Sequence, residues 1–144
     1  MRTFVVCLAV VASLVACSEP TGNGSATELS LVQHEIQWSH RDFHSYSFDV
    51  VDQQFGGTYS AHVTVVNDVV TAAVDPLTGI ASNAPVSWPT IDALFASARG
   101  AVGGKGLEVT LKFNDQLGYV SELDINSSNP GGPYSAVVSN FHAL

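Results

Sequence analysis

Hydrophobic residues recur along this chain with two different periods. Apolar side chains at every second position in several segments, and valine-rich runs in others, predict six β-strands, at residues 46–50, 59–65, 69–74, 107–113, 119–126 and 134–141. Apolar side chains at helical spacing predict two α-helices, one over residues 27–41 and a shorter one that begins after Thr90. The predicted order of elements is therefore α-β-β-β-α-β-β-β.

The first predicted helix combines a capping signal with an apolar surface. Ser25 and Glu28 fit a capping box at its N-terminus. Its apolar residues are Leu29, Val32, Ile36 and, further on, Phe43 at helical spacing, with Leu31 and Trp38 on an adjacent stripe. We expect this helix to pack on the sheet.

The predicted strands favour a sheet that is mainly antiparallel. Asn67-Asp68 lies between two valine-rich runs and predicts a tight hairpin, because both residue types tolerate positive φ. Residues 75–89 are rich in Pro, Ser, Gly and Asn and predict a loop. Short hairpins favour antiparallel pairing, with both helices on one face. The expected fold is a single α+β domain with a six-stranded, mainly antiparallel sheet and two helices on one face.

The N-terminus has the layout of a secretory signal. Arg2 precedes an apolar run from Phe4 to Val15, and this run is shorter than the roughly 20 residues that span a bilayer. Residues 14–17, Leu-Val-Ala-Cys, look like a bacterial lipobox, whose cysteine is lipidated after cleavage. An ordinary secretory peptide and an N-terminal anchor helix are the alternatives. We assign residues 1–16 to a lipoprotein signal peptide, 17–26 to a flexible linker and 27–144 to the domain.

Lipidation of Cys17 would make the membrane a partner of this protein. One acyl chain gives only marginal binding, so stable anchoring takes more than one. Lipoproteins with a similar lipobox carry several chains on this cysteine. Ser18, which follows Cys17, resembles the pattern sorted to the outer membrane, facing the periplasm, in diderm bacteria. The expected location is therefore a membrane of the cell envelope.

Charge and cysteine content narrow the functional classes. The chain has five basic and 13 acidic residues, and removal of Arg2 leaves a mature net charge of 4 − 13 = −9. Nucleic-acid binding depends on clustered Lys and Arg, so nucleic acid is not an expected partner. Loss of Cys7 with the signal and lipidation of Cys17 leave the domain without a disulfide, a cysteine nucleophile or a cysteine metal site.

Two histidines are the main candidates for a metal site. His40 and His44 lie four residues apart on either side of Asp42 and would share one face of a continuing helix. No third ligand lies nearby, and the helix dipole favours histidine near a C-terminus in any case. We therefore expect a solvated helix end, and we assign no metal, cofactor or catalytic residue.

Three further segments have weaker signals. Asp124 to Asn129 resembles the start of a calcium loop but lacks its glycine and its glutamate, which indicates a surface turn. Gly100 to Gly106 is glycine-rich, but its order of helix then strand is the reverse of a phosphate loop. Trp88 either forms an exposed contact surface or packs against the second helix.

An ordered set of motifs runs through the domain: Trp38, Tyr46-Ser47-Phe48, Pro89 to Phe95, Leu107 to Thr110, Leu117-Gly118-Tyr119, Ile125, and Tyr134 to Phe141. Together they resemble a bacterial family of secreted proteins and lipoproteins, domain of unknown function 6174, over residues 31–141. The resemblance implies no activity, substrate or catalytic residue, because the family has none assigned. We interpret these residues as determinants of the fold.

The sequence thus predicts an envelope lipoprotein that acts as a non-enzymatic binding or interaction module. Its expected partners are the membrane, through Cys17, and an envelope protein or a small ligand, with the domain as a monomer. The alternative is an enzyme, either metal-dependent through the region of His40 and His44 or based on a pair of the 13 acidic residues.

Overall fold

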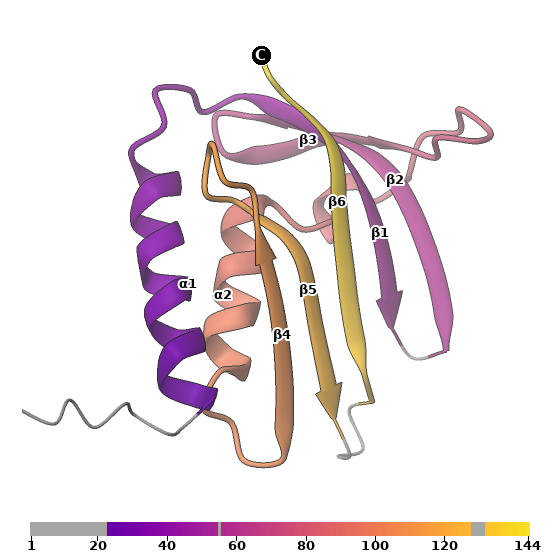
Figure 1. Ribbon diagram of the computed structural model, residues 1–144. Coiled ribbons are helices and arrows are strands. Elements are labelled where there is room, and N and C mark those ends of the chain that lie inside the picture. The colour runs from indigo at the N-terminus through magenta and orange to yellow at the C-terminus, as the bar shows by residue number, and fades with distance from the viewer. Residues whose placement is uncertain (1–22, 55, 128–131) are drawn as a thin grey trace, which may run out of the picture.

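The computed structural model describes residues 23–54, 56–127 and 132–144 (Figure 1). Its elements are α1 (Asn23–Ser39), β1 (Tyr46–Gln54), β2 (Gly57–Val66), β3 (Val69–Val74), the 3₁₀ turn η1 (Pro85–Ser87), α2 (Ile91–Ala101), β4 (Leu107–Phe113), β5 (Val120–Ser127) and β6 (Tyr134–Ala143). The predicted order of helices and strands is confirmed. The predicted signal peptide and Cys17 lie outside the described residues.

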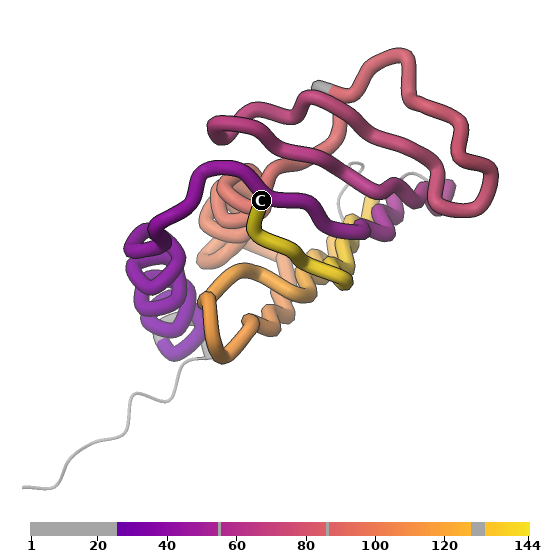
Figure 2. The backbone as a smooth tube through the Cα atoms, turned by 90° about the horizontal axis from the view of Figure 1, so that it is seen from above, coloured from indigo at the N-terminus to yellow at the C-terminus, as the bar shows by residue number. Residues whose placement is uncertain are grey.

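A single sheet runs through the domain in the order β3-β2-β1-β6-β5-β4. Every pairing in it is antiparallel, which confirms the predicted α+β fold with an antiparallel sheet. Because β1 pairs with β6 at the centre, the sheet consists of two three-stranded meanders, β1–β3 and β4–β6. Figures 1 and 2 show both helices on the same face of this sheet, which we call the inner face.

The inner face is covered differently over its two halves. α2 packs against β4 and β5, and α1 packs against α2 and β4. Over the other half, η1 packs against β3 as part of the segment that leads from β3 to α2. A loop therefore covers the β2–β3 side where helices cover the β4–β5 side.

Two local predictions are confirmed at the ends of elements. Asn67 and Asp68 both have positive φ, 51° and 64°, in the hairpin between β2 and β3. The side-chain oxygen of Thr90 accepts a hydrogen bond from the amide of Ala93 at 3.1 Å and so caps α2. The predicted apolar face of α2 is also buried: Ile91, Leu94, Phe95 and Ala98.

The first helix has different bounds from those predicted. It begins at Asn23 rather than Thr27 and ends at Ser39 rather than Arg41. The helix thus includes the last four residues assigned to the linker, and Ser25 lies within it rather than at its cap. None of the described helices is long and apolar enough to cross a membrane.

The buried face of α1 is also different from the expected one. Leu31 and Trp38, on the adjacent stripe, are only 2% and 1% exposed. The residues at the main helical spacing point outward instead, with exposed fractions of 60% for Leu29, 45% for Val32 and 52% for Ile36. α1 thus packs against the sheet at β4, as expected, but it buries the adjacent stripe rather than the residues at the main helical spacing.

Trp38 explains this orientation of α1. Its ring lies edge-on, at centroid distances of 5.5 to 6.1 Å, to four aromatic rings: Phe43, Tyr46, Tyr119 and Phe141. Its Nε1–H donates a hydrogen bond to Asp92 Oδ1 at 3.1 Å, and the guanidinium of Arg41 lies 4.2 Å from the ring centroid. A buried tryptophan needs both an apolar pocket and a partner for its N–H. The aromatic pocket and the hydrogen-bond acceptor Asp92 both contact Trp38, so the face of α1 that carries Trp38 is the face that is buried.

Candidate functional site

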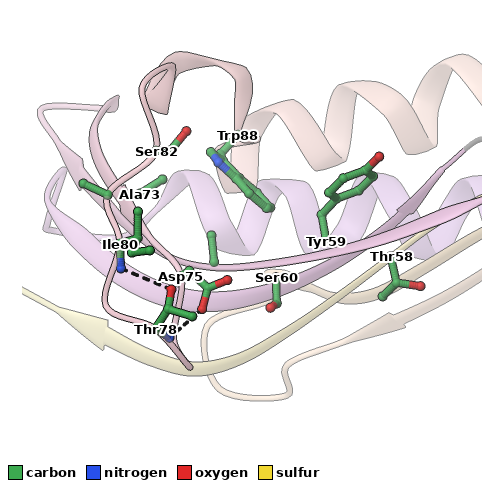
Figure 3. A pocket seen from close by; sticks show the side chains of 11 residues that line it. Thr58, Tyr59, Ser60, Ala73, Asp75, Thr78, Ile80, Ser82 and Trp88 are labelled. Atoms are coloured by element: carbon green, nitrogen blue, oxygen red, sulfur yellow. Dashed lines mark hydrogen bonds between the residues drawn. The ribbon is translucent and has the colours of Figure 1, made fainter.

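A hollow of about 500 Å³ lies between the inner face of β2 and β3 and the loop of residues 75–88 (Figure 3). A second hollow, of about 270 Å³, lies beside it near the end of β1. Both are lined by Tyr59, Ser82 and Trp88, so they are continuous, and we call them together the loop groove. The larger hollow has the size of a small-molecule site.

Hydrogen bonds fix the loop that forms one wall of the groove. Asp75 Oδ1 accepts bonds from the amides of Leu77 and Thr78, both at 2.8 Å, as Figure 3 shows in part. The bonds from Thr78 and then Leu77 lower the pKa of Asp75. Further along, the amide of Ser82 donates to the carbonyl of Ala73 in β3 at 2.8 Å. The first part of the loop is therefore held by its own turn at Asp75, and its middle is tied to β3 through Ser82.

Asp52 lies at the β1 end of the groove, where it lines the smaller hollow. Asp52 is only 6% exposed, and its Oδ1 has no hydrogen-bond partner among the described residues. Burial raises the pKa of this carboxyl. Buried polar atoms without a partner are uncommon in folded proteins, and each one needs an explanation.

Asp52 is not among the predicted site residues, although the strand pattern contains a signal for it. The inward-facing residues of β1 are Tyr46, Phe48 and Val50, and the same alternation places Asp52 inward. The strand was predicted to end at residue 50, whereas it continues to Gln54. Extending the alternation by one step reveals an acidic residue in a buried register.

Three aromatic side chains surround Asp52. Tyr59 is its direct partner across the β1–β2 pair, and Trp88 lines the same hollow. Burial, and to a smaller extent the charge of Asp52, raises the pKa of Tyr134 to about 12. Figure 3 shows the rings of Tyr59 and Trp88 beside each other, on the same side of the strand. A carboxylate with aromatic walls can accept hydrogen bonds and attract a cation.

The candidate histidines do not come together as a metal site. Because α1 ends at Ser39, His40 and His44 do not share a helical face. His44 Nδ1 instead contacts Asp68 Oδ2 at 2.7 Å, in an exposed pair. Within the ranges that the structure describes, no group of three or more His, Cys, Asp or Glu residues is placed to hold a metal ion.

The other candidate segments have structural roles. Residues 124–127 belong to strand β5 rather than to a calcium loop, and residues 128 and 129 lie outside the described ranges. The glycine-rich stretch from Gly100 to Gly106 leads from α2 into β4. Trp88 is half-buried: it packs against the hydrophobic core and also lines the groove.

A second polar cluster lies on the outer face of the sheet. Asp49 Oδ1 lies 2.6 Å from His62 Nδ1, and Asn140 Nδ2 donates to Asp49 Oδ2 at 2.7 Å. The bonds from Asn140 and His62 lower the pKa of Asp49. Both oxygens of this carboxylate are thus satisfied within the protein, in contrast to Asp52.

Residues 30–142 match the model of one protein family, described as a family of unknown function (DUF6174). No curated protein and no solved structure matches the chain. The matched range includes every strand except the last residue of β6, and it includes the whole of the loop groove. The chain therefore belongs to the family of unknown function DUF6174.

Proposed function

We propose that this protein is a lipid-anchored binding module of the cell envelope, held at a membrane by acylated Cys17, with the loop groove as its ligand site. The observation that carries the proposal is the buried Oδ1 of Asp52, which lies beside a hollow and has no hydrogen-bond partner in the described part of the chain. An unpaired buried charge costs free energy, and proteins tend to keep such local conflicts at functional sites. A ligand that supplies the missing hydrogen-bond partner would offset this cost when it binds.

The construction of the loop also supports binding. Asp75 and Ser82 attach the loop to its own turn and to β3, so the groove exists without a ligand. A site that is already formed loses little conformational entropy when the ligand binds. The groove is therefore suited to holding a small molecule rather than to folding around it.

The position of the groove is compatible with an anchor at Cys17. Helix α1 begins at Asn23, so five residues, or at most about 20 Å of extended chain, separate it from the anchor. α1 packs on β4 at one edge of the sheet, and the groove lies at β3, on the opposite edge. Figures 1 and 2 show the loop of residues 75–88, which follows β3, at the far end of the molecule from α1. The groove thus stays accessible when the N-terminus is held at a membrane.

Thermal unfolding in the presence of small molecules from the cell envelope tests the groove. A ligand that binds the native state raises Tm. We expect the small-molecule fraction of an envelope extract to raise the Tm of the native sequence, and to have no effect on Trp88→Leu, which removes an aromatic wall but keeps an apolar side chain. An equal rise in both proteins, or no rise in either, would contradict the groove as the site.

Substitution of Cys17 tests the anchor separately. We expect Cys17→Ala to lose acyl labelling and to leave the membrane fraction, because the thiol is the point of attachment. Ser18→Ala is the matched control, since it changes the neighbouring residue and keeps the thiol. Acyl labelling that persists in Cys17→Ala would show that the anchor lies elsewhere.

A carboxylate-based enzyme is the second candidate, because the groove holds two acids with opposite pKa shifts. The pKa of Asp52 is raised and that of Asp75 is lowered, a pattern found in acid–base pairs. We rank this candidate lower because Asp75 Oδ1 already accepts two backbone amides. Hydrolysis of a panel of glycosides that both Asp52→Asn and Asp75→Asn abolish would establish the enzyme instead.

A further inference from the structure

The basic side chains of this domain are all placed away from Asp52. Three of them pair with other acids, Arg41 with Asp68 and Asp92, Arg99 with Glu35, and Lys112 with Glu122. Lys105 lies between α2 and β4, toward the opposite edge of the sheet. No Lys or Arg among the described residues therefore serves as a partner for Asp52, and such a charge would come from outside the domain.

The walls beside Asp52 are suited to a cation. The ring of Tyr59 lies over Gly57, where a Cβ atom would come within 2.7 Å of the Tyr59 hydroxyl oxygen. Glycine at this position thus allows the ring to lie close to the backbone, and both Tyr59 and Asp52 line the smaller hollow. Trp88 forms the second aromatic wall. Aromatic faces attract ammonium and guanidinium groups, and more strongly so where water is displaced.

The chemistry of the site discriminates among ligand charges. An anion would meet a domain (residues 27–144) of net charge 4 − 12 = −8 and the carboxylate of Asp52. A neutral alcohol would donate a hydrogen bond but would leave the buried charge without a counter-charge. An ammonium or guanidinium group provides both the N–H donor and the positive charge.

We infer that the loop groove binds small organic cations with N–H donors, namely alkylammonium or alkylguanidinium compounds, through Asp52 between Tyr59 and Trp88. The smaller hollow, of about 270 Å³, takes the cationic head beside Asp52. The larger one, of about 500 Å³, takes the aliphatic tail along Ala73 and Ile80. This inference rests on the proposed function and adds the chemical class of the ligand.

Titration with three hexyl compounds of different charge tests the inference. The probes are n-hexylammonium, 1-hexanol and hexanoate, and binding is followed by calorimetry and by the fluorescence of Trp88, one of two tryptophans in the chain. We expect saturable binding of n-hexylammonium, at least about tenfold weaker binding of 1-hexanol because it lacks the charge, and no binding of hexanoate. The affinity for n-hexylammonium should also fall as the salt concentration rises.

Variants show whether Asp52 is responsible. Asp52→Asn keeps the shape and removes the charge, and it should weaken n-hexylammonium binding by at least about tenfold. Asp115→Asn, at an exposed turn, changes the net charge equally and should alter the affinity by less than about twofold. Trp88→Leu should weaken binding and remove the fluorescence response, which assigns the signal to the groove.

The possible failures separate this inference from the proposed function. The choice of a cation is overturned if 1-hexanol and n-hexylammonium bind equally well, or if Asp52→Asn binds n-hexylammonium as tightly as the native sequence does. In either case, loss of ligand binding in Trp88→Leu would still support the groove as the site. No saturable binding of n-hexylammonium also overturns it, and the envelope-extract experiment then decides independently whether the groove binds another ligand. Tighter binding of Nα-acetyl-lysine amide than of n-hexylammonium overturns the assignment to a small molecule, because it points to a protein side chain.

Discussion

The helices α1 and α2 pack on the same face of one sheet, but different interactions set their orientations. α2 buries its hydrophobic stripe, consisting of Ile91, Leu94, Phe95 and Ala98. α1 buries Leu31 and Trp38 and leaves three aliphatic side chains in solvent: Leu29, Val32 and Ile36. The orientation of α2 follows from the sum of its apolar residues, whereas that of α1 follows from one tryptophan and its partners.

This difference shows where hydrophobic periodicity stops being informative. Periodicity gives each apolar residue a similar weight. Trp38 counts for more than an aliphatic residue, because its ring contacts four aromatic rings and its N–H donates to Asp92. Arg41 then binds both Asp92 and the hairpin residue Asp68. One polar and aromatic cluster therefore joins α1, α2 and the β2–β3 hairpin.

Trp38→Ala provides the largest expected effect and the most direct test of this comparison. We expect it to lower the free energy of unfolding by roughly 3–5 kcal/mol, because it leaves a cavity among the aromatic rings and removes the hydrogen bond to Asp92. Phe95→Ala, in α2, should cost a similar roughly 3–5 kcal/mol. Urea unfolding of both variants measures the two losses. A loss below about 1 kcal/mol for Trp38→Ala alone would show that the cluster does not hold α1.

Two glycine substitutions test the contact between α1 and the turn before β5. Gly118 has φ of 78°, and a Cβ there would lie 2.8 Å from the carbonyl oxygen of His34 in α1. Gly79 has a similar φ of 70° but open space around it. We expect Gly79→Ala to cost about 1 kcal/mol from backbone strain, and Gly118→Ala to cost at least about 1 kcal/mol more. Equal losses in thermal or urea unfolding would mean that α1 can move away from the turn.

Two carboxylates extend the comparison to the half of the sheet without helices. Asp92 is paired with Trp38 and Arg41, whereas the buried Oδ1 of Asp52 has no hydrogen-bond partner among the described residues. Because burial raises the folded-state pKa of Asp52 above its unfolded value, the stability that this group contributes at low pH is lost as the pH rises through the folded-state pKa. We expect Asp52→Asn to raise Tm at pH 7 and to leave it nearly unchanged at pH 3.

Asp92→Asn is the control for this pH dependence. It removes a charge that the protein pairs, so it should lower Tm at pH 7. The measurement is a thermal unfolding series from pH 3 to pH 7 for both variants and the native sequence. A lower Tm for Asp52→Asn at pH 7 would show that a donor outside the described residues binds this carboxylate.

The features that could be predicted from the sequence are those that depend on neighbouring residues. The cap at Thr90 and the turn at Asn67-Asp68 depend on side chains and φ values within a few positions, and both are present. The site depends on distant segments, because the fold brings Asp52 of β1 beside Trp88 of the loop. No spacing along the chain encodes that contact. The inward position of Asp52 could be predicted from the strand pattern. That its Oδ1 lacks a partner among the described residues could be recognised only once the fold had placed the basic residues elsewhere.

The exposed stripe of α1 provides the smallest expected effect. Leu29→Gln, Val32→Gln and Ile36→Gln should each change the free energy of unfolding by less than about 0.5 kcal/mol, because 45–60% of each residue is already in solvent. Leu94→Ala in α2, where the side chain is fully buried, should cost roughly 2–5 kcal/mol. Urea unfolding of the four variants compares the two helices directly. Losses above about 1 kcal/mol on the α1 stripe would mean that these side chains are covered, and the rotation of α1 assigned to Trp38 would then have to be abandoned.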